Sequence, residues 1–240
     1  MTNIAWFDLV WCLLPILLVG FIYVRWQGEP SEILIAIARM LIQLIAVGYV
    51  LVTIFNNPSP LISLAIVTLM LAVAAWIAIR PVRKQAGFFL PALMALGISV
   101  VIHLSISVML ILKAENWFQP ELLIPLAGMY FANTMNAISL SAERFYAEIQ
   151  SGQKLDQARI TAFHAAMIPQ INGLLAVGLV ALPGMMTGQI LSGVSPLVAV
   201  RYQIMIMVMI LGASGVGAAL MLQLLKNKSM GTAVANELSD

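Results

Sequence analysis

Two asparagines, Asn133 and Asn136, flank Thr134 inside a long apolar run. On a helix, residues three apart share one side, so both amides point the same way. At membrane depth an amide is costly unless it finds a hydrogen-bond partner. Amide carbonyl oxygens can also replace part of an ion's hydration shell. The pair therefore predicts either an interhelical hydrogen bond or part of a substrate pathway.

Arg39 and Gln43 form a second polar pair, four residues apart within another apolar run. This spacing places both side chains on one helix face. Arg39 lies only one or two turns from the expected membrane edge, so its guanidinium could reach lipid headgroups. The alternative is that the pair faces other helices and lines or gates a pathway.

The segment LPGMMTGQ at residues 182–189 combines helix-breaking residues with two thioethers, Met185 and Met186, and with Gln189. Broken helices in transporters expose backbone carbonyls at the substrate site. Glycines spaced four apart also allow close helix packing without any ligand. Thioether sulfur and amide oxygen suit a transition metal, which makes Met185, Met186 and Asn133 candidate metal contacts.

A run of alternating methionines follows at residues 205, 207 and 209. Only Met205 and Met209 share a helix face, so we expect ordinary packing there. His103 stands alone in its apolar run without a carboxylate nearby, and we expect it to pack between helices.

The sequence lacks the patterns that would make this chain an enzyme. It has no nucleotide-binding loop of the Gly-x-x-x-x-Gly-Lys-Ser/Thr type, no His-Glu-x-x-His zinc motif and no Ser/His/Asp set. Its single cysteine, Cys12, rules out an internal disulfide and a cysteine metal cage. We expect no catalytic residue and no cofactor, and any ATP chemistry must come from another chain.

Composition indicates that lipid is the solvent for most of this chain. Of its 240 residues, 62% are hydrophobic and only 9% are charged, whereas soluble domains carry about 25% charged residues. The net charge of +2 is too small to suggest nucleic acid as a partner. The N-terminal run lacks a basic start, so we do not expect a cleavable signal peptide.

The apolar runs predict an all-α, polytopic membrane protein, a single permease domain over residues 1–240. A bilayer core needs about 20 apolar residues per helix. Seven candidate spans satisfy this length: Ile4–Val24, Ile33–Phe55, Leu61–Ile79, Phe88–Leu112, Leu122–Leu140, Ile168–Met186 and Leu197–Leu225.

The distribution of lysine and arginine predicts the orientation of these spans, because cytoplasmic loops are enriched in both. The alternate loops that are rich in them hold Arg25, Arg80, Arg83, Lys84, Arg144, Lys154, Arg159, Lys226 and Lys228. The opposite loops hold only Lys113 and Arg201. Seven spans with an outside N-terminus and a cytoplasmic C-terminus fit this division.

One sizeable hydrophilic segment, residues 143–167, joins the fifth and sixth spans. We expect it to be a cytoplasmic amphipathic element that couples the membrane domain to an ATPase. Its candidate coupling residues are Glu143, Arg144, Glu148, Lys154 and Arg159.

Three stretches together resemble the FetB family of ABC-transporter permeases, which includes bacterial iron exporters and plant relatives linked to aluminium tolerance. The first is ARMLIQLIAVGYVL at residues 38–51. The second is PLAGM at residues 125–129, followed by NTMNA at residues 133–137. The third runs from IPQIN at residues 168–172 through VGLVALPGMMTGQ at residues 177–189 to RYQIM at residues 201–205.

The resemblance implies a homodimeric permease in the bacterial inner membrane, paired with two copies of a separate ATPase that binds ATP and Mg²⁺. It also implies export of iron or a related metal. The predicted pathway residues, drawn from the polar groups above and from these stretches, are Arg39, Gln43, Met129, Asn133, Asn136, Gln170, Asn172, Met185, Met186 and Gln189.

Two departures from the family pattern affect these expectations. Ala132 stands where the family pattern has glycine, a change that affects packing. The hydrophilic segment is shorter by about a dozen residues and lacks an Ala/Leu-rich element that we assign to ATPase contact. The coupling to an ATPase is therefore the part of the mechanism that the resemblance supports least.

Three other functions are compatible with the residues. A secondary carrier or channel would work without ATP, but such proteins usually contain an intramembrane carboxylate, and here only Asp8 lies near a span interior. A permease for a small organic solute would use the same amides. A scaffold that anchors an ATPase would need no pathway at all.

Overall fold

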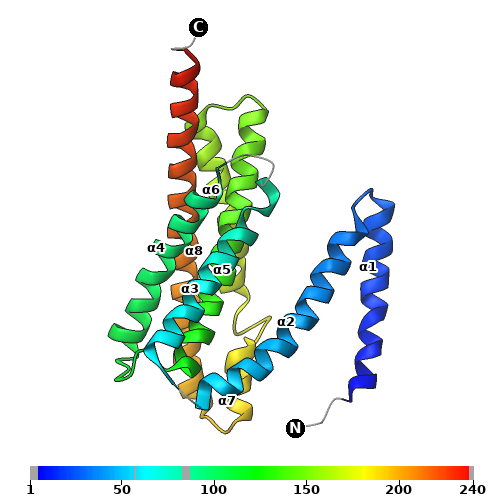
Figure 1. Ribbon diagram of the computed structural model, residues 1–240, viewed down its shortest axis with the longest axis vertical. Helices are drawn as coiled ribbons and strands as arrows, with labels where there is room; N and C mark the ends of the chain where they lie inside the picture. The colour runs from blue at the N-terminus through cyan, green and yellow to red at the C-terminus, as the bar shows by residue number, and fades with distance from the viewer. Residues whose placement is uncertain (1–4, 57, 83–86, 238–240) are drawn as a thin grey trace. The chain divides into compact units, whose positions relative to one another are not determined.

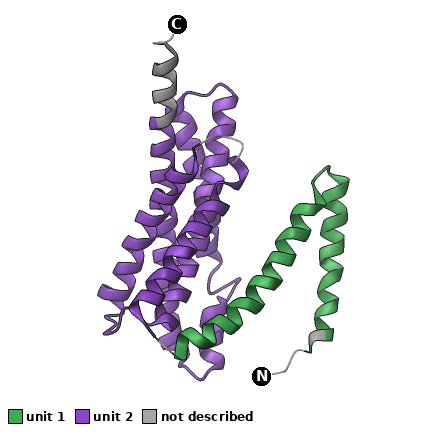
Figure 2. Ribbon diagram, in the orientation of Figure 1, with its two compact units in different colours: residues 1–57 green, residues 58–240 purple. Residues whose placement is uncertain are grey.

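The computed structural model describes residues 5–56, 58–82 and 87–237, with the side chains of Trp6 and residues 228–237 left undescribed. Helices account for the fold, and the described residues contain no named strand. Arg83 and Lys84, which contribute to the charge bias, lie outside these ranges. Two compact units share the chain, residues 1–57 and 58–240 (Figure 2). The all-α prediction is confirmed, whereas the single permease domain stays a prediction.

The first unit is a helical hairpin (Figure 1). It contains the 3-10 helix η1 (Trp6–Cys12), α1 (Leu13–Arg25) and α2 (Pro30–Asn56). Gln27 turns the chain with a φ of 62°. The Tyr23 hydroxyl, at the end of α1, donates to Glu32 Oε2 at 2.9 Å near the start of α2. This polar contact lies at the turn, and most of the remaining surface of both helices is apolar and exposed.

The second unit contains the remaining helices. They are α3 (Pro60–Ala78), η2 (Arg80–Val82), α4 (Phe89–Ser105), the π-helix η3 (Ile106–Ile111), α5 (Pro120–Gln150), α6 (Leu155–Ala176), α7 (Gly184–Leu191) and α8 (Pro196–Glu237). Prolines begin α2, α3, α5 and α8. Proline suits the first helical position because the N–H that it lacks has no partner there.

Five helical segments among the described residues are long and apolar enough to cross a bilayer: Phe7–Arg25, Pro30–Asn56, Pro60–Ala78, Phe89–Ile111 and Pro196–Asn227. They correspond to the predicted first, second, third, fourth and seventh spans. The predicted fifth span lies within α5, whose polar and charged side chains lower its hydropathy. The count of seven spans thus stays a prediction.

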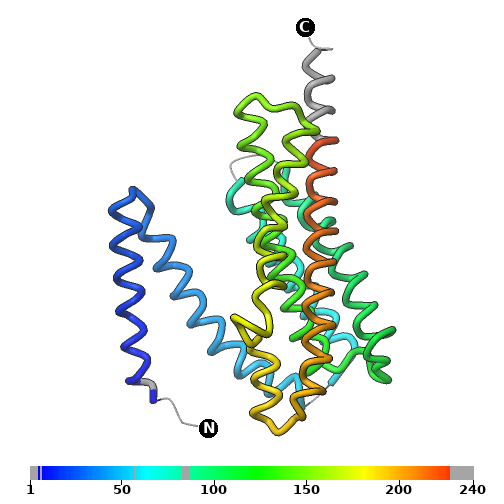
Figure 3. Tube along the Cα trace, turned by 180° about the vertical axis from the view of Figure 1, so that it is seen from behind, coloured from blue at the N-terminus to red at the C-terminus, as the bar shows by residue number. Residues whose placement is uncertain are grey.

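The predicted sixth span, Ile168–Met186, does not form one helix. Helix α6 begins thirteen residues earlier, at Leu155, and ends at Ala176. Gly178 then adopts a φ of +87°, which a residue with a side chain rarely adopts, and its N–H donates to the Ala181 carbonyl at 2.9 Å. Helix α7 begins after Pro183 (Figure 3). The chain is therefore broken within the segment for which the sequence predicts a broken helix.

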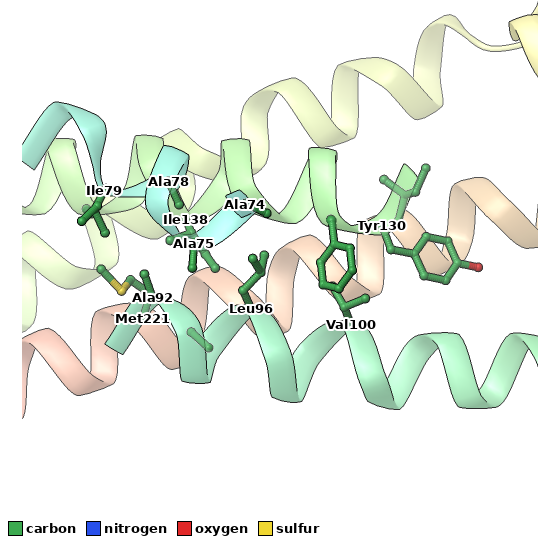
Figure 4. Packing of buried hydrophobic residues seen from close by; sticks show 14 of the residues in the cluster. Ala74, Ala75, Ala78, Ile79, Ala92, Leu96, Val100, Tyr130, Ile138 and Met221 are labelled. Carbon is green, nitrogen blue, oxygen red and sulfur yellow. The ribbon is translucent and has the colours of Figure 1, made fainter. Parts of the chain in front are cut away.

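Small side chains let the helices of the second unit pack closely. Ala75, Ala78 and Ala92 are fully buried between α3 and α4, next to Leu96 and Val100 (Figure 4). Alanine at a helix contact allows the two backbones to approach, which favours dispersion contacts where lipid supplies no hydrophobic driving force. Together with buried residues of α5 and α8, these residues form one continuous core.

Buried hydroxyl groups link the same helices. Ser99 Oγ on α4 donates to the Ala213 carbonyl on α8 at 2.6 Å. Ser107 Oγ donates to the His103 carbonyl, so the buried Tyr130 hydroxyl on α5 donates to Ser107 Oγ, at 2.7 Å. Each bond satisfies a polar group that would be costly to leave unpaired in an apolar interior.

His103 packs between helices, as the sequence predicts. Its Nδ1 lies 2.8 Å from the Ser99 carbonyl oxygen in the same helix. A Cβ atom on Gly212 of α8 would lie only 2.5 Å from His103 Nε2. The absence of a side chain at Gly212 therefore makes room for the imidazole.

Candidate functional site

A cavity of about 410 Å³ lies within the second unit, among α5, α6, α7 and α8. Met129, Asn133 and Asn136 of α5 line one side. Gln170 of α6 and Met185 of α7 line it as well. The structure thus brings together five of the ten predicted pathway residues.

The break between α6 and α7 shapes this cavity. Pro183, which precedes α7, and Gly184, its first residue, line the cavity together with Met185. Pro169 and Gly173 line it from α6, and neither residue ends that helix. The residues that follow the break thus form part of the cavity wall, together with residues of α5 and α8.

Asn133 has its side-chain nitrogen bound to its own helix. The Nδ2 atom donates to the Met129 carbonyl oxygen at 2.9 Å. This bond uses one of the two N–H donors of the amide, so Asn133 can offer its Oδ1 acceptor and one remaining N–H to a ligand. Asn136 lies one turn further along the same cavity wall.

Gln203 and Met207, both on α8, also line the cavity. Neither belongs to the predicted pathway set. They stand four residues apart, so they share a helix face, and Gln203 is only 7% exposed. The Gln203 amide, which departs from an apolar run, is the sequence signal that could have identified this face of α8.

Three further predicted pathway residues of the second unit lie elsewhere. Met186 lines a neighbouring, mainly apolar cavity of about 320 Å³. Asn172 is exposed on α6. Gln189 lies on α7, and its buried Oε1 atom has no hydrogen-bond partner among the described residues.

The other two predicted pathway residues, Arg39 and Gln43, belong to α2 in the first unit. Both side chains are exposed. Because the cavity belongs to the second unit, their part in a pathway stays a prediction.

The cavity contains only neutral polar groups. No charged side chain lines it among the described residues. No group of three or more His, Cys, Asp or Glu side chains that could hold a metal occurs in that part of the chain either. Its donor atoms are amide oxygens and nitrogens and the thioether sulfurs of Met129, Met185 and Met207, which can hold a polar or soft ligand without an ion pair.

The predicted coupling segment forms a helical hairpin made of the end of α5, a turn at residues 151–154 and the start of α6. Gly152 takes a φ of +86° in this turn. Ser151 Oγ donates to the Glu148 carbonyl at 2.8 Å. Figure 1 shows this hairpin beside the C-terminal part of α8.

Polar contacts tie the hairpin to α8. Lys226 Nζ donates to Asp156 Oδ1 at 2.6 Å, and Arg159 donates to Gln223 Oε1 at 2.6 Å. Arg159 also lies 3.4 Å from Asp156. The hydrogen bond and the charge of Lys226 lower the pKa of the Asp156 carboxyl group from its ordinary value. We call Asp156, Arg159, Gln223 and Lys226 the α6–α8 clamp.

The predicted coupling residues divide into two groups. Arg144 forms an ion pair with Glu148, which is only 6% exposed, and Arg159 belongs to the clamp. Glu143 and Lys154 are exposed. Among the predicted coupling residues of the hairpin, Glu143 and Lys154 are thus the two whose charges remain available to a partner protein.

Comparison with known proteins identifies a family and several relatives. The family model described as "Uncharacterised protein family (UPF0014)" matches residues 6–160 and 152–230. These two matches meet at residues 152–160, inside the hydrophilic segment for which the sequence predicts a shortening. No solved structure matches.

The relatives include bacterial and plant membrane proteins. The chain is 36% identical over 227 residues to the UPF0014 membrane protein slr1647 of Synechocystis, covering 87% of each chain. It is 33% identical over 199 residues to the probable iron export permease protein FetB of Escherichia coli, covering 77% of this chain and 76% of that one. It is 28% identical over 205 residues to protein ALUMINUM SENSITIVE 3 of Arabidopsis thaliana, covering 78% and 73%.

Proposed function

Because the chain belongs to the UPF0014 family of membrane proteins, we propose that it is the membrane-spanning permease subunit of an ABC transporter. The observation that carries this proposal is the cavity of amide and thioether groups beside a broken helix. Buried polar groups cost free energy within a bilayer, so a cavity that gathers several of them favours a substrate site over a packing defect. The predicted resemblance to FetB-type permeases is confirmed.

The proposed topology has seven passes, with α6 and α7 together making the sixth. The N-terminus lies outside and the C-terminus in the cytoplasm. In the second unit, Arg144, Lys154, Arg159 and Lys226 lie at the end that contains the α5–α6 hairpin (Figure 1). The positive-inside rule places that end in the cytoplasm, and the membrane is the bacterial inner membrane.

ATP hydrolysis is assigned to a separate ATPase subunit that holds ATP and Mg²⁺, and this chain is proposed to have no enzymatic activity. The ATPase docks on the α5–α6 hairpin, where Glu143 and Lys154 are exposed. A homodimer of the permease binds two ATPase copies. Movement of the hairpin reaches the cavity directly, because α5 and α6 supply both the hairpin and three of its amide groups.

The cargo that we propose is iron or a related metal, moved out of the cell. Support for export and for a metal comes from the name of the Escherichia coli relative. A small organic solute is the alternative cargo, because about 410 Å³ lies within the range of small-molecule sites. An ATP-independent carrier is the alternative mechanism.

The test is reconstitution of the full chain with its co-expressed ATPase in vesicles. We expect the ATPase to co-purify, and we expect metal transport to require ATP. The double substitution Asn133→Leu with Asn136→Leu should abolish transport while the ATPase still binds. Asn172→Leu makes the same chemical change at an exposed position outside the cavity and should leave transport intact.

Three outcomes would redirect the proposal. Transport that follows a proton gradient without ATP would identify a secondary carrier. Full transport by the double variant would remove the cavity from the mechanism and leave a scaffold. Unchanged metal content in cells that lack the protein would favour an organic solute.

A further inference from the structure

Three methionines from three different helices line the same cavity. Met129 comes from α5, Met185 from α7 and Met207 from α8. Methionine is a common filler of hydrophobic cores, and the two neighbours of Met207 in the alternating run do serve that purpose. Met205 is 7% exposed within the core, and Met209 packs against it. Met129 and Met185 also pack against this core, but together with Met207 they line the cavity, which Met205 and Met209 do not.

The remaining polar groups of the cavity narrow the kind of ligand. Asn133, Asn136, Gln170 and Gln203 supply neutral amides. Hard cations such as Fe³⁺ and Mg²⁺ bind through oxygen ligands, with carboxylates foremost among them. The described residues around this cavity supply no carboxylate. Thioether sulfur is a soft ligand, and among biological metals it selects Cu(I).

Charge leads to the same conclusion. The cost of moving an ion from water into a low-dielectric interior is large, and it rises with the square of the charge. Neutral amides and thioethers offset part of this cost through their dipoles, but they cannot neutralise two or three positive charges. A monovalent ion is therefore the cation that a cavity with neutral walls holds at the lowest cost.

We propose that this cavity binds a soft monovalent transition-metal cation, Cu(I), through the thioethers of Met129, Met185 and Met207. The amide oxygens contribute to its solvation. The ion is the cargo, so this inference rests on the proposed function and, within iron or a related metal, selects Cu(I) over iron. Binding to the purified chain needs neither the ATPase nor transport, and it can fail while the permease function stands.

The test measures Ag(I) binding to the full chain in lipid nanodiscs, because Ag(I) resembles Cu(I) and is not easily oxidised. The triple variant M129L/M185L/M207L keeps nearly the same side-chain volumes. We expect wild type to bind one Ag(I) with at least tenfold higher affinity than this variant. Cu(I) should compete with Ag(I), whereas Fe(II) at the same concentration should not.

A matched control corrects for the weak binding of Ag(I) to scattered thioethers, since the chain has 15 methionines. Like the cavity variant, the control variant replaces three methionines with leucine. These are Met40, Met94 and Met109, which are exposed and lie outside the cavity. This control should bind Ag(I) like wild type. Equal affinity of wild type and the cavity variant would overturn the proposal, and so would tight Fe(II) binding without Ag(I) binding.

X-ray absorption at the copper edge on wild-type protein provides a measurement that does not depend on whether any variant folds. Sulfur neighbours around bound Cu(I) are expected. A shell of nitrogen and oxygen alone would contradict the assignment to thioethers. ATPase co-purification with the same preparation keeps the two proposals separable, because a chain that binds the ATPase but not Ag(I) refutes only the copper assignment.

Discussion

Helices α5 and α8 approach closely at Gly217, and this contact can be tested by adding one methyl group. A Cβ atom at this position would lie 2.4 Å from Thr134 Cγ2, whereas carbon atoms in contact prefer a separation of about 3.5–4.0 Å. Both residues are buried. Because a β-branched side chain on a helix has few χ1 rotamers, Gly217→Ala must push the two helices apart by roughly 1 Å.

Gly215→Ala supplies the matched control. Its new Cβ would meet Met167 Cε at 3.6 Å, an ordinary contact with the end of a flexible side chain. Both substitutions gain the same helix propensity, about 1 kcal/mol, so this contribution cancels in the comparison. Overpacking a well-packed core costs about 1–3 kcal/mol, and we expect G217A to be less stable than G215A by that amount.

Thr134→Ser removes the methyl group that causes the clash. Alone it should cost about 1 kcal/mol for the lost buried methyl, but combined with G217A it should restore most of the lost stability. The assay is denaturation by sodium dodecyl sulfate, monitored by circular dichroism, for the four members of the cycle. Equal stability of G217A and G215A, or strict additivity of T134S and G217A, would show that α5 and α8 do not meet here as described.

Three more predictions concern the ends and the core of the second unit. Lys226→Met should return the pKa of Asp156 toward its ordinary value. Because the native pKa is lowered, wild type should be more stable than K226M well above pH 4, and this difference should vanish as the pH falls through the native pKa. Unfolding measured from pH 7 to pH 3 checks this. Ser99→Ala should cost about 0.5–1.5 kcal/mol in the same assay, since it removes the buried bond to the Ala213 carbonyl. Gly152→Ala should cost about 1–2 kcal/mol, because its φ is +86°, and protease nicking at the hairpin turn should increase.

The long apolar helices could be predicted from the sequence because their signal is local. For the apolar segments Pro30–Asn56, Pro60–Ala78, Phe89–Ile111 and Pro196–Asn227, runs long enough to span a bilayer predicted the bounds to within a few residues. Helix α6 was harder to predict, because its first half is polar and the apolar run begins only at Ile168, next to Pro169. The proline is accommodated inside the helix, and the break comes at Gly178, where a positive φ is required.

The candidate site was only partly predictable for a different reason. Asn133 and Asn136 could be recognised because amides depart from an apolar background, and Met185 because it lies in the Pro- and Gly-interrupted segment 182–189. Met207 could not, because a methionine in an apolar helix is typical of both a core and a cavity. Its role depends on which neighbours surround α8, and that is a tertiary property.

The two faces of α5 connect the stability of the bundle to the chemistry of the cavity. Tyr130 and Thr134 are one turn apart and are fully buried in the core, whereas Asn133, next to Thr134, lines the cavity. The contact between Thr134 and Gly217 therefore bears on the position of α5, and with it on the position of the Asn133 amide. A methyl group at Gly217 that displaces α5 from α8 should weaken Ag(I) binding and transport although Gly217 does not line the cavity, and T134S should restore both. Since G215A leaves the α5–α8 contact intact, it should leave binding and transport intact as well.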